Sequence, residues 1–164
     1  NCGYVHLPHV INPEESYIEY IYKSGVTAGL RSHYDAYAKE IVNAAVSHNP
    51  LDIENIVRVA IITEPLMAKH VVDSTMQSYP ERMLDILVVA IKALPDQVVS
   101  IVRDTLRISP DNTEVVSVAI NSSSGDKARE IIAAAIKSGI SEESATAAAI
   151  AGGANKTDLA KVDQ

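Results

Sequence analysis

The sequence predicts an all-α fold, an α-solenoid of short antiparallel helices, and three observations carry that prediction. Prolines recur at a fixed interval, apolar residues recur at fixed places between them, and charged residues flank the same places. The regularly spaced prolines are Pro50, Pro65, Pro80, Pro95 and Pro110, each fifteen residues from the last. A fixed period is typical of repeat proteins, in which each unit buries its apolar face against its neighbours.

Residues 36–155 can be written as eight units of fifteen residues, numbered so that residues 36, 51 and 66 each occupy position 1. Apolar residues concentrate at positions 3, 6, 7, 10 and 11, and position 10 is mostly small. Spacings of three and four residues match one face of a helix, whereas a strand would alternate. We therefore expect one helix of about 11–12 residues per unit and short turns that make neighbouring helices antiparallel.

The prolines are expected to begin helices. A proline inside a continuous helix removes a hydrogen bond and costs about 3 kcal/mol, which excludes one unbroken helix with the same period. At the first helical position that N–H has no partner, so proline is tolerated there. Asn49 and Ser109 precede prolines as N-cap candidates, and acids in first turns with bases in last turns match the helix dipole.

Residues 1–35 differ from the units and are expected to form an N-terminal arm and a Tyr-rich capping helix. Asn12 and Pro13, followed by two glutamates, predict a helix over residues 13–23, which Gly25 ends. A longer helix is expected to begin near Gly29 or Leu30 and to enter the first unit. Terminal units of repeat arrays are atypical because they cover an otherwise exposed face.

Six of the seven tyrosines lie within residues 1–37. Tyrosine is amphipathic and is common at binding surfaces, so Tyr17, Tyr20, Tyr34 and Tyr37 are candidates for an interaction surface. The alternative is that these rings fill the cap against the first unit.

Cys2, His6 and His9 form a C-x3-H-x2-H pattern. Thiolate and imidazole are suitable zinc or copper ligands, which makes these residues a candidate metal site. A structural zinc site needs a fourth ligand, and His33 is the only nearby histidine that offers one. The alternatives are a packed N-terminal arm without metal, or an intermolecular disulfide through Cys2.

The sequence contains no motif of an established catalytic class. It lacks a phosphate-binding glycine loop, H-E-x-x-H and G-x-S-x-G. His70 lies at position 5, which the repeat assigns to the solvated face. We therefore predict no enzyme and no cofactor.

The repeat weakens towards the C-terminus. Ser117 and Asn121 stand where apolar residues belong, and the unit 141–155 is rich in alanine. Polar groups in an apolar stripe cost stability unless they are paired. These two side chains are therefore expected either to bond across a helix interface or to lie in an open groove that serves for docking. Residues 156–164 are expected to form a polar tail.

Over residues 36–155 the periodic apolar stripe resembles the broad α-solenoid class that includes HEAT and tetratricopeptide repeats. The signature residues of both families are missing, and the helix pair of two fifteen-residue units is shorter than either repeat. The resemblance implies an architecture and a binding role, and it carries over no functional residue.

The net charge of −7 argues against nucleic acid, whose binding depends on Lys and Arg. No apolar run is long enough to insert in a membrane. Because the chain starts Asn1-Cys2-Gly3 without Met, we expect a periplasmic or secreted protein of the bacterial envelope, and otherwise a cytoplasmic one. The predicted function is a non-enzymatic protein-interaction module or scaffold, with homo-oligomers left open. The alternative is a carrier of a small apolar ligand or a metal, using the N-terminal region.

Overall fold

The computed structural model describes residues 28–63, 65–123, 127–155 and 159. Every regular element in these residues is helical. The α-helices are α2 (Ala28–His48), α3 (Ile53–Thr63), α4 (Ala68–Ser78), α5 (Met83–Ala93), α6 (Val98–Ile108), α7 (Glu114–Ser122), α8 (Ala128–Lys137) and α9 (Glu142–Ala151). Four short 3-10 turns precede α3 to α6: η1 (Pro50–Asp52), η2 (Pro65–Met67), η3 (Pro80–Arg82) and η4 (Pro95–Gln97).

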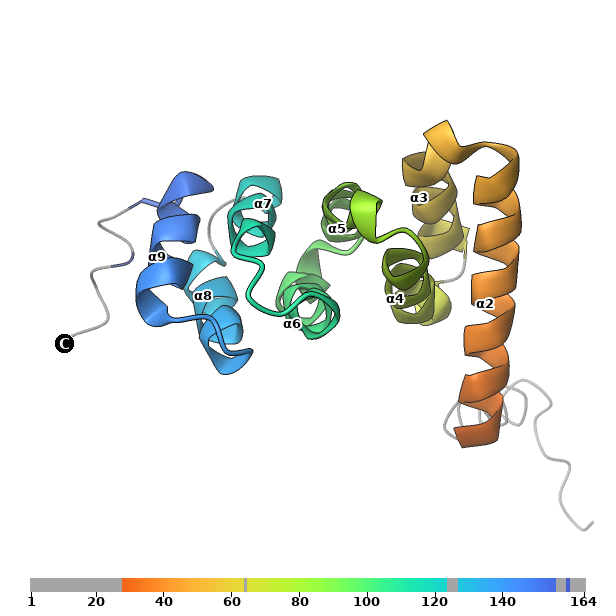
Figure 1. The fold of residues 1–164 in the computed structure, drawn as a ribbon, viewed down its shortest axis with the longest axis horizontal. Coiled ribbons are helices and arrows are strands. Elements are labelled where there is room, and N and C mark those ends of the chain that lie inside the picture. The colour runs from red at the N-terminus through yellow and green to blue at the C-terminus, as the bar shows by residue number, and fades with distance from the viewer. Residues whose placement is uncertain (1–27, 64, 124–126, 156–158, 160–164) are drawn as a thin grey trace, which may run out of the picture.

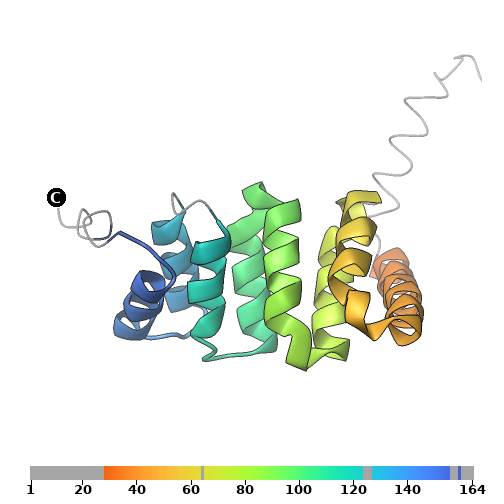
Figure 2. The same ribbon diagram turned by 90° about the horizontal axis from the view of Figure 1, so that it is seen from above.

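The helices form an elongated array two layers thick (Figure 1). One layer stacks α2, α4, α6 and α8, and the other stacks α3, α5, α7 and α9, while successive helices pack across the layers. Seen from above, the helices of the array stand side by side from α2 at one end to α9 at the other (Figure 2). The protein is an all-α solenoid, as its fifteen-residue period predicts.

Four of the five periodic prolines begin a 3-10 turn that leads directly into an α-helix. At Tyr79 one residue joins two helices: its N–H donates to the Thr75 carbonyl at 2.9 Å, and its carbonyl accepts from the Arg82 N–H at 3.0 Å. The proline after it needs no acceptor for an N–H, so the reversal leaves few unsatisfied groups. The prediction that prolines start helices is confirmed for Pro50, Pro65, Pro80 and Pro95.

The same prediction is wrong at Pro110. Asp111 adopts a left-handed backbone with φ of 63°, and a left-handed residue cannot continue a right-handed helix. The next helix starts only at Glu114, whose N–H donates to Asn112 Oδ1 at 3.1 Å. This side-chain turn supplies the acceptor that a regular helix start would lack. Ser109 thus precedes a turn, and Asn49 makes no side-chain capping bond.

The core is the predicted apolar stripe. In α5, Ile86, Leu87 and Ala90 are fully buried, and each buried aliphatic side chain of leucine size contributes about 1.5–3 kcal/mol. Thr75 and Thr105, both at position 10, are buried too. Their hydroxyls donate to carbonyls of their own helices, at 2.6 and 2.8 Å, so the small polar residues cost little in the core.

α2 begins at Ala28, close to the expected start, and runs unbroken to His48. It crosses from the expected N-terminal region into the first repeat unit without interruption. Its N-terminal part extends past α4 in Figure 1. The first unit is therefore the second half of a longer helix.

Candidate interaction groove

Contacts within each layer show which unit positions face which neighbour. Lys69, at position 4 of its unit, binds Asp104 at position 9 of the next helix in the layer, with 2.6 Å between Nζ and Oδ2. Glu54, also at position 4, lies 3.5 Å from Arg82, at position 2 of the next helix in the other layer. Each helix therefore turns position 4 towards the following helix of its layer, and positions 2 and 9 towards the preceding one.

α2 and α3 are the first described helices of their layers, and an apolar groove of about 520 Å³ lies on them. Its lining comes from α2, from α3 and from the start of α4. The chief apolar lining residues are Tyr37, Ile41, Ile56, Val59, Ala60 and Met67. Most of these are at positions 2, 6 and 9, so the groove consists of side chains that face backwards along the array.

Comparison along the array shows how unusual this exposure is. Val59 is 53% exposed, whereas Val89, at the same position of α5, is 8% exposed. Ile41 is 49% exposed, whereas Ile86, at the same position, is fully buried. In later helices such as α5, the equivalent face is covered by the helix two places before it in the chain. The groove is this same face on α2 and α3. Leaving apolar surface in water is unfavourable by roughly 25 cal/mol per Å², which favours an occupant.

A row of polar side chains from the end of η1 into α3 borders the groove. Arg58 donates to Asn55 Oδ1 at 3.2 Å, and Asn55 donates in turn to Asp52 Oδ1. Asp52 and Asn55 also line the groove. An apolar centre with a polar rim is typical of protein-interaction surfaces.

Exposed large apolar residues gather at the same end of the described array. Those at the N-terminal end are Tyr37, Ile41, Leu51, Val59, Ile62 and Leu66, and only Ile136 and Ile150 are found beyond it. Leu51 and Leu66 are 90% and 83% exposed. The apolar surface of the described molecule is therefore concentrated around α2, α3 and the turn that follows.

The structure brings one predicted interaction residue into this groove, which is Tyr37. Tyr34 belongs to α2, and its side chain is outside the described set. Tyr17 and Tyr20, like the candidate metal ligands Cys2, His6 and His9, lie outside the described residues. Their predicted roles stay predictions.

Sequence reasoning missed Ile41 and Ile56 because the repeat pattern assigns position 6 to the core, and it missed Val59 because position 9 lies outside the apolar stripe. The signal that could have found them is their place in the first units. A residue that faces backwards in a first unit has no earlier unit to cover it.

Ser117 and Asn121 lie away from this groove. Asn121 is exposed, and the Ser117 hydroxyl donates to the Glu114 carbonyl of its own helix at 3.0 Å. The backbone of Ser117 packs against Gly152, where an added Cβ would lie 2.9 Å from the Ser117 Cα and closer still to its carbonyl oxygen. The small residue at position 7 therefore belongs to a close contact between α7 and the end of α9.

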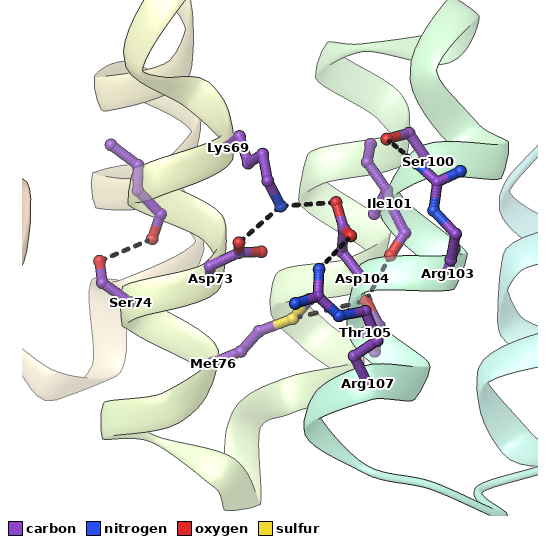
Figure 3. A network of polar contacts seen from close by, with 11 residues as sticks. Lys69, Asp73, Ser74, Met76, Ser100, Ile101, Arg103, Asp104, Thr105 and Arg107 are labelled. Carbon is purple, nitrogen blue, oxygen red and sulfur yellow. Dashed lines mark hydrogen bonds and ion pairs between the residues drawn. The ribbon is translucent and has the colours of Figure 1, made fainter. Parts of the chain in front are cut away.

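A network of ion pairs joins α4 and α6 (Figure 3). Lys69 bonds Asp73 at 2.7 Å as well as Asp104, and Arg107 reaches the other oxygen of Asp104 at 3.3 Å. Partial burial disfavours the charged ammonium, but hydrogen bonds and charges of Asp104 and Asp73 outweigh it and raise the pKa of Lys69. Because these charges are paired with one another, the network links the stacked helices α4 and α6.

Within the described residues, no group of three His, Cys, Asp or Glu side chains is placed to hold a metal ion. None of the described helices combines the length and the apolar character needed to cross a membrane. The groove is a candidate functional site because its lining, within the described residues, is mainly apolar.

Comparisons of this chain with protein-family models, with curated proteins and with solved structures find no significant match.

Proposed function

We propose that this protein is a non-enzymatic interaction module that binds a short apolar or amphipathic helix in the groove of α2, α3 and α4. The exposed core-type face around Ile41 and Val59 is the observation that carries the proposal. Binding of an amphipathic helix in an apolar groove is a recurrent mode of recognition, with anchor residues three and four apart on the helix. The resemblance to HEAT and tetratricopeptide arrays supports the same role.

The size of the groove favours a helix over a flat contact. From Tyr37 to Ala45 the α2 wall extends about 12 Å at a rise of 1.5 Å per residue, and the α3 wall from Asn55 to Thr63 is equally long. A helix of two to three turns would lie between these walls as a repeat helix lies on its neighbours. The partner therefore supplies a helix of roughly the length found in this array.

The test compares crosslinked partners recovered by three forms of the protein. Val59→Asp places a charge in the groove, while Ile62→Asp places the same charge on the same helix at a similarly exposed site outside the groove. A partner bound in the groove is recovered by the unchanged chain and by Ile62→Asp, and is lost with Val59→Asp. Equal recovery by both variants would remove the groove from the proposal.

A small apolar ligand is the second candidate, because 520 Å³ lies within the usual range of ligand pockets. Ile41 and Val59 stay half exposed on the rim, so a small ligand would leave much apolar surface in water. Extraction of the purified protein followed by mass spectrometry tests this alternative. The envelope location, the protein partner and the absence of enzymatic activity remain predictions from the sequence.

A further inference from the structure

We infer that residues 13–23 of this same chain occupy the groove, packed as a helix across α2 and α3. The inference rests on the proposed function in one respect, since both assign a helix to the same groove. A partner helix then has to displace this segment, which makes the N-terminal region a competitor for the module's own site.

The order of the array leads to this occupant. α5 stacks on α3, and α4 stacks on α2, so each helix is covered by the one two places before it in the chain. By the same rule α3 is covered by the helix that precedes α2, and α2 begins at Ala28. The covering helix therefore comes from the residues that end at 27.

The only predicted helix in those residues has the right pattern. On a helix over 13–23, Tyr17, Ile18 and Ile21 share one face, with Glu14 on the same face in the first turn, and Tyr20 and Tyr22 flank it. The opposite face carries Glu15, Glu19 and Lys23. An apolar stripe of this width covers the groove while Glu15, Glu19 and Lys23 remain in water and Glu14 lies at the N-terminal end of the stripe, as suits a terminal helix of an array.

The connection is long enough to place this helix on the groove. From Ala28 to Tyr37, where the groove begins, α2 rises about 14 Å at 1.5 Å per residue. The five peptide steps from Lys23 to Ala28 span up to about 17 Å when extended. A helix over 13–23 can therefore end beside Tyr37 and run antiparallel to α2. In this position it lies along the whole groove.

The short connection also favours the same chain over a second copy. A segment tethered by a few residues has an effective concentration on the order of millimolar near its site. The opposite end of the array offers less large apolar surface to a second copy, because Ile136 and Ile150 are the large apolar residues exposed on α8 and α9.

The test uses the full chain, with Cys2→Ser to remove the native thiol. Ile18→Cys and Ile21→Cys are each paired with Val59→Cys in the groove, and matched controls pair them with Ile136→Cys on α8. We expect a disulfide within one chain for at least one groove pair and none for the controls, read from peptide masses under non-reducing conditions. A disulfide only between chains, or none with Val59→Cys, overturns the inference.

A second measurement does not depend on disulfide geometry. A fluorescent peptide of residues 10–25 is titrated into the unchanged chain, into Ile18→Asp/Ile21→Asp, and into a control with Glu15→Gln/Glu19→Gln on the polar face. Release of the tethered segment should make the Asp variant bind the peptide at least about tenfold more tightly than the other two. Equal affinity in all three overturns the inference.

The two proposals fail differently. Loss of intramolecular pairing together with partner recovery that still depends on Val59 would overturn the tethered occupant and keep the proposed function. Intramolecular pairing, without any partner whose recovery depends on Val59, would keep the tethered occupant and overturn the proposed function.

Discussion

The two ends of the described array expose opposite faces of the same repeat, and they are built from different side chains. At the N-terminal end, Tyr37, Ile41 and Val59 leave large apolar groups in solvent. At the C-terminal end, the exposed positions on α8 and α9 carry charged residues, serine and alanine, and the exposed large apolar residues there are Ile136 and Ile150, at 39% and 36%. Polar and small side chains are compatible with water, so the described C-terminal helices leave less large apolar surface exposed than the groove at the N-terminal end.

The middle of the array lies between these extremes, and there the repeat position alone decides burial. This contrast can be tested by substituting the same type of residue, at the same position of the repeat unit, in different helices of the array. The expected effects decrease from the core, to the last close contact at the C-terminal end, to the charged surface.

The largest effect is expected from Ile91→Ala, compared with Ile136→Ala. Both residues are isoleucines at position 11, but Ile91 is 1% exposed and Ile136 is 39% exposed. Removing the buried side chain leaves a cavity and should lower the free energy of unfolding by about 2–5 kcal/mol. Ile136→Ala should cost less than about 1 kcal/mol, because half of its site is already open. Denaturant unfolding measures both, and equal losses would show that a further element covers α8.

An intermediate effect is expected from Gly152→Ala. The added Cβ would meet the backbone of Ser117, which cannot rotate away, so α7 and α9 must separate. Overpacking of this kind costs typically about 1–3 kcal/mol. Thermal unfolding measures the loss.

The control for this substitution is Ser117→Gly in the same chain. Because the opposing atoms are backbone, removing the Ser117 side chain should not restore stability to Gly152→Ala. Rescue by Ser117→Gly would show that the contact involves the side chain and would contradict the packing described for this end.

The fold was predictable because one signal repeats many times. Five prolines and the apolar positions between them determine helix number, direction and core through most of the array. Pro110 was mispredicted because a tight turn depends on one backbone angle at Asp111, and aspartate is tolerated in both the left-handed and the ordinary conformation. A periodic pattern carries no information about such a local choice.

The groove was only partly predictable, for a related reason. Tyr37 stood out by residue type, whereas Ile41 and Val59 resemble their buried equivalents in every property that the sequence displays. Their exposure depends on which helix lies in front of them in space. That is a property of place in the array, and it becomes visible only once the stacking direction is known from pairs such as Lys69 and Asp104.

The smallest effect is expected at that pair. Lys69→Met removes a half-exposed clamp between α4 and α6, and exposed ion pairs contribute only about 0.2–1 kcal/mol after screening by solvent. The pKa of Lys69 is raised in the folded protein, so its contribution is complete below the ordinary lysine pKa of about 10.4 and is lost as the pH rises through the higher folded value. The stability difference between the unchanged chain and Lys69→Met should therefore be constant from about pH 7 to 9 and shrink at more alkaline pH. Lys92→Met on the exposed face of α5 is the matched control, and a difference that persists above the folded pKa would mean that the lysine stem, rather than its charge, joins the two helices.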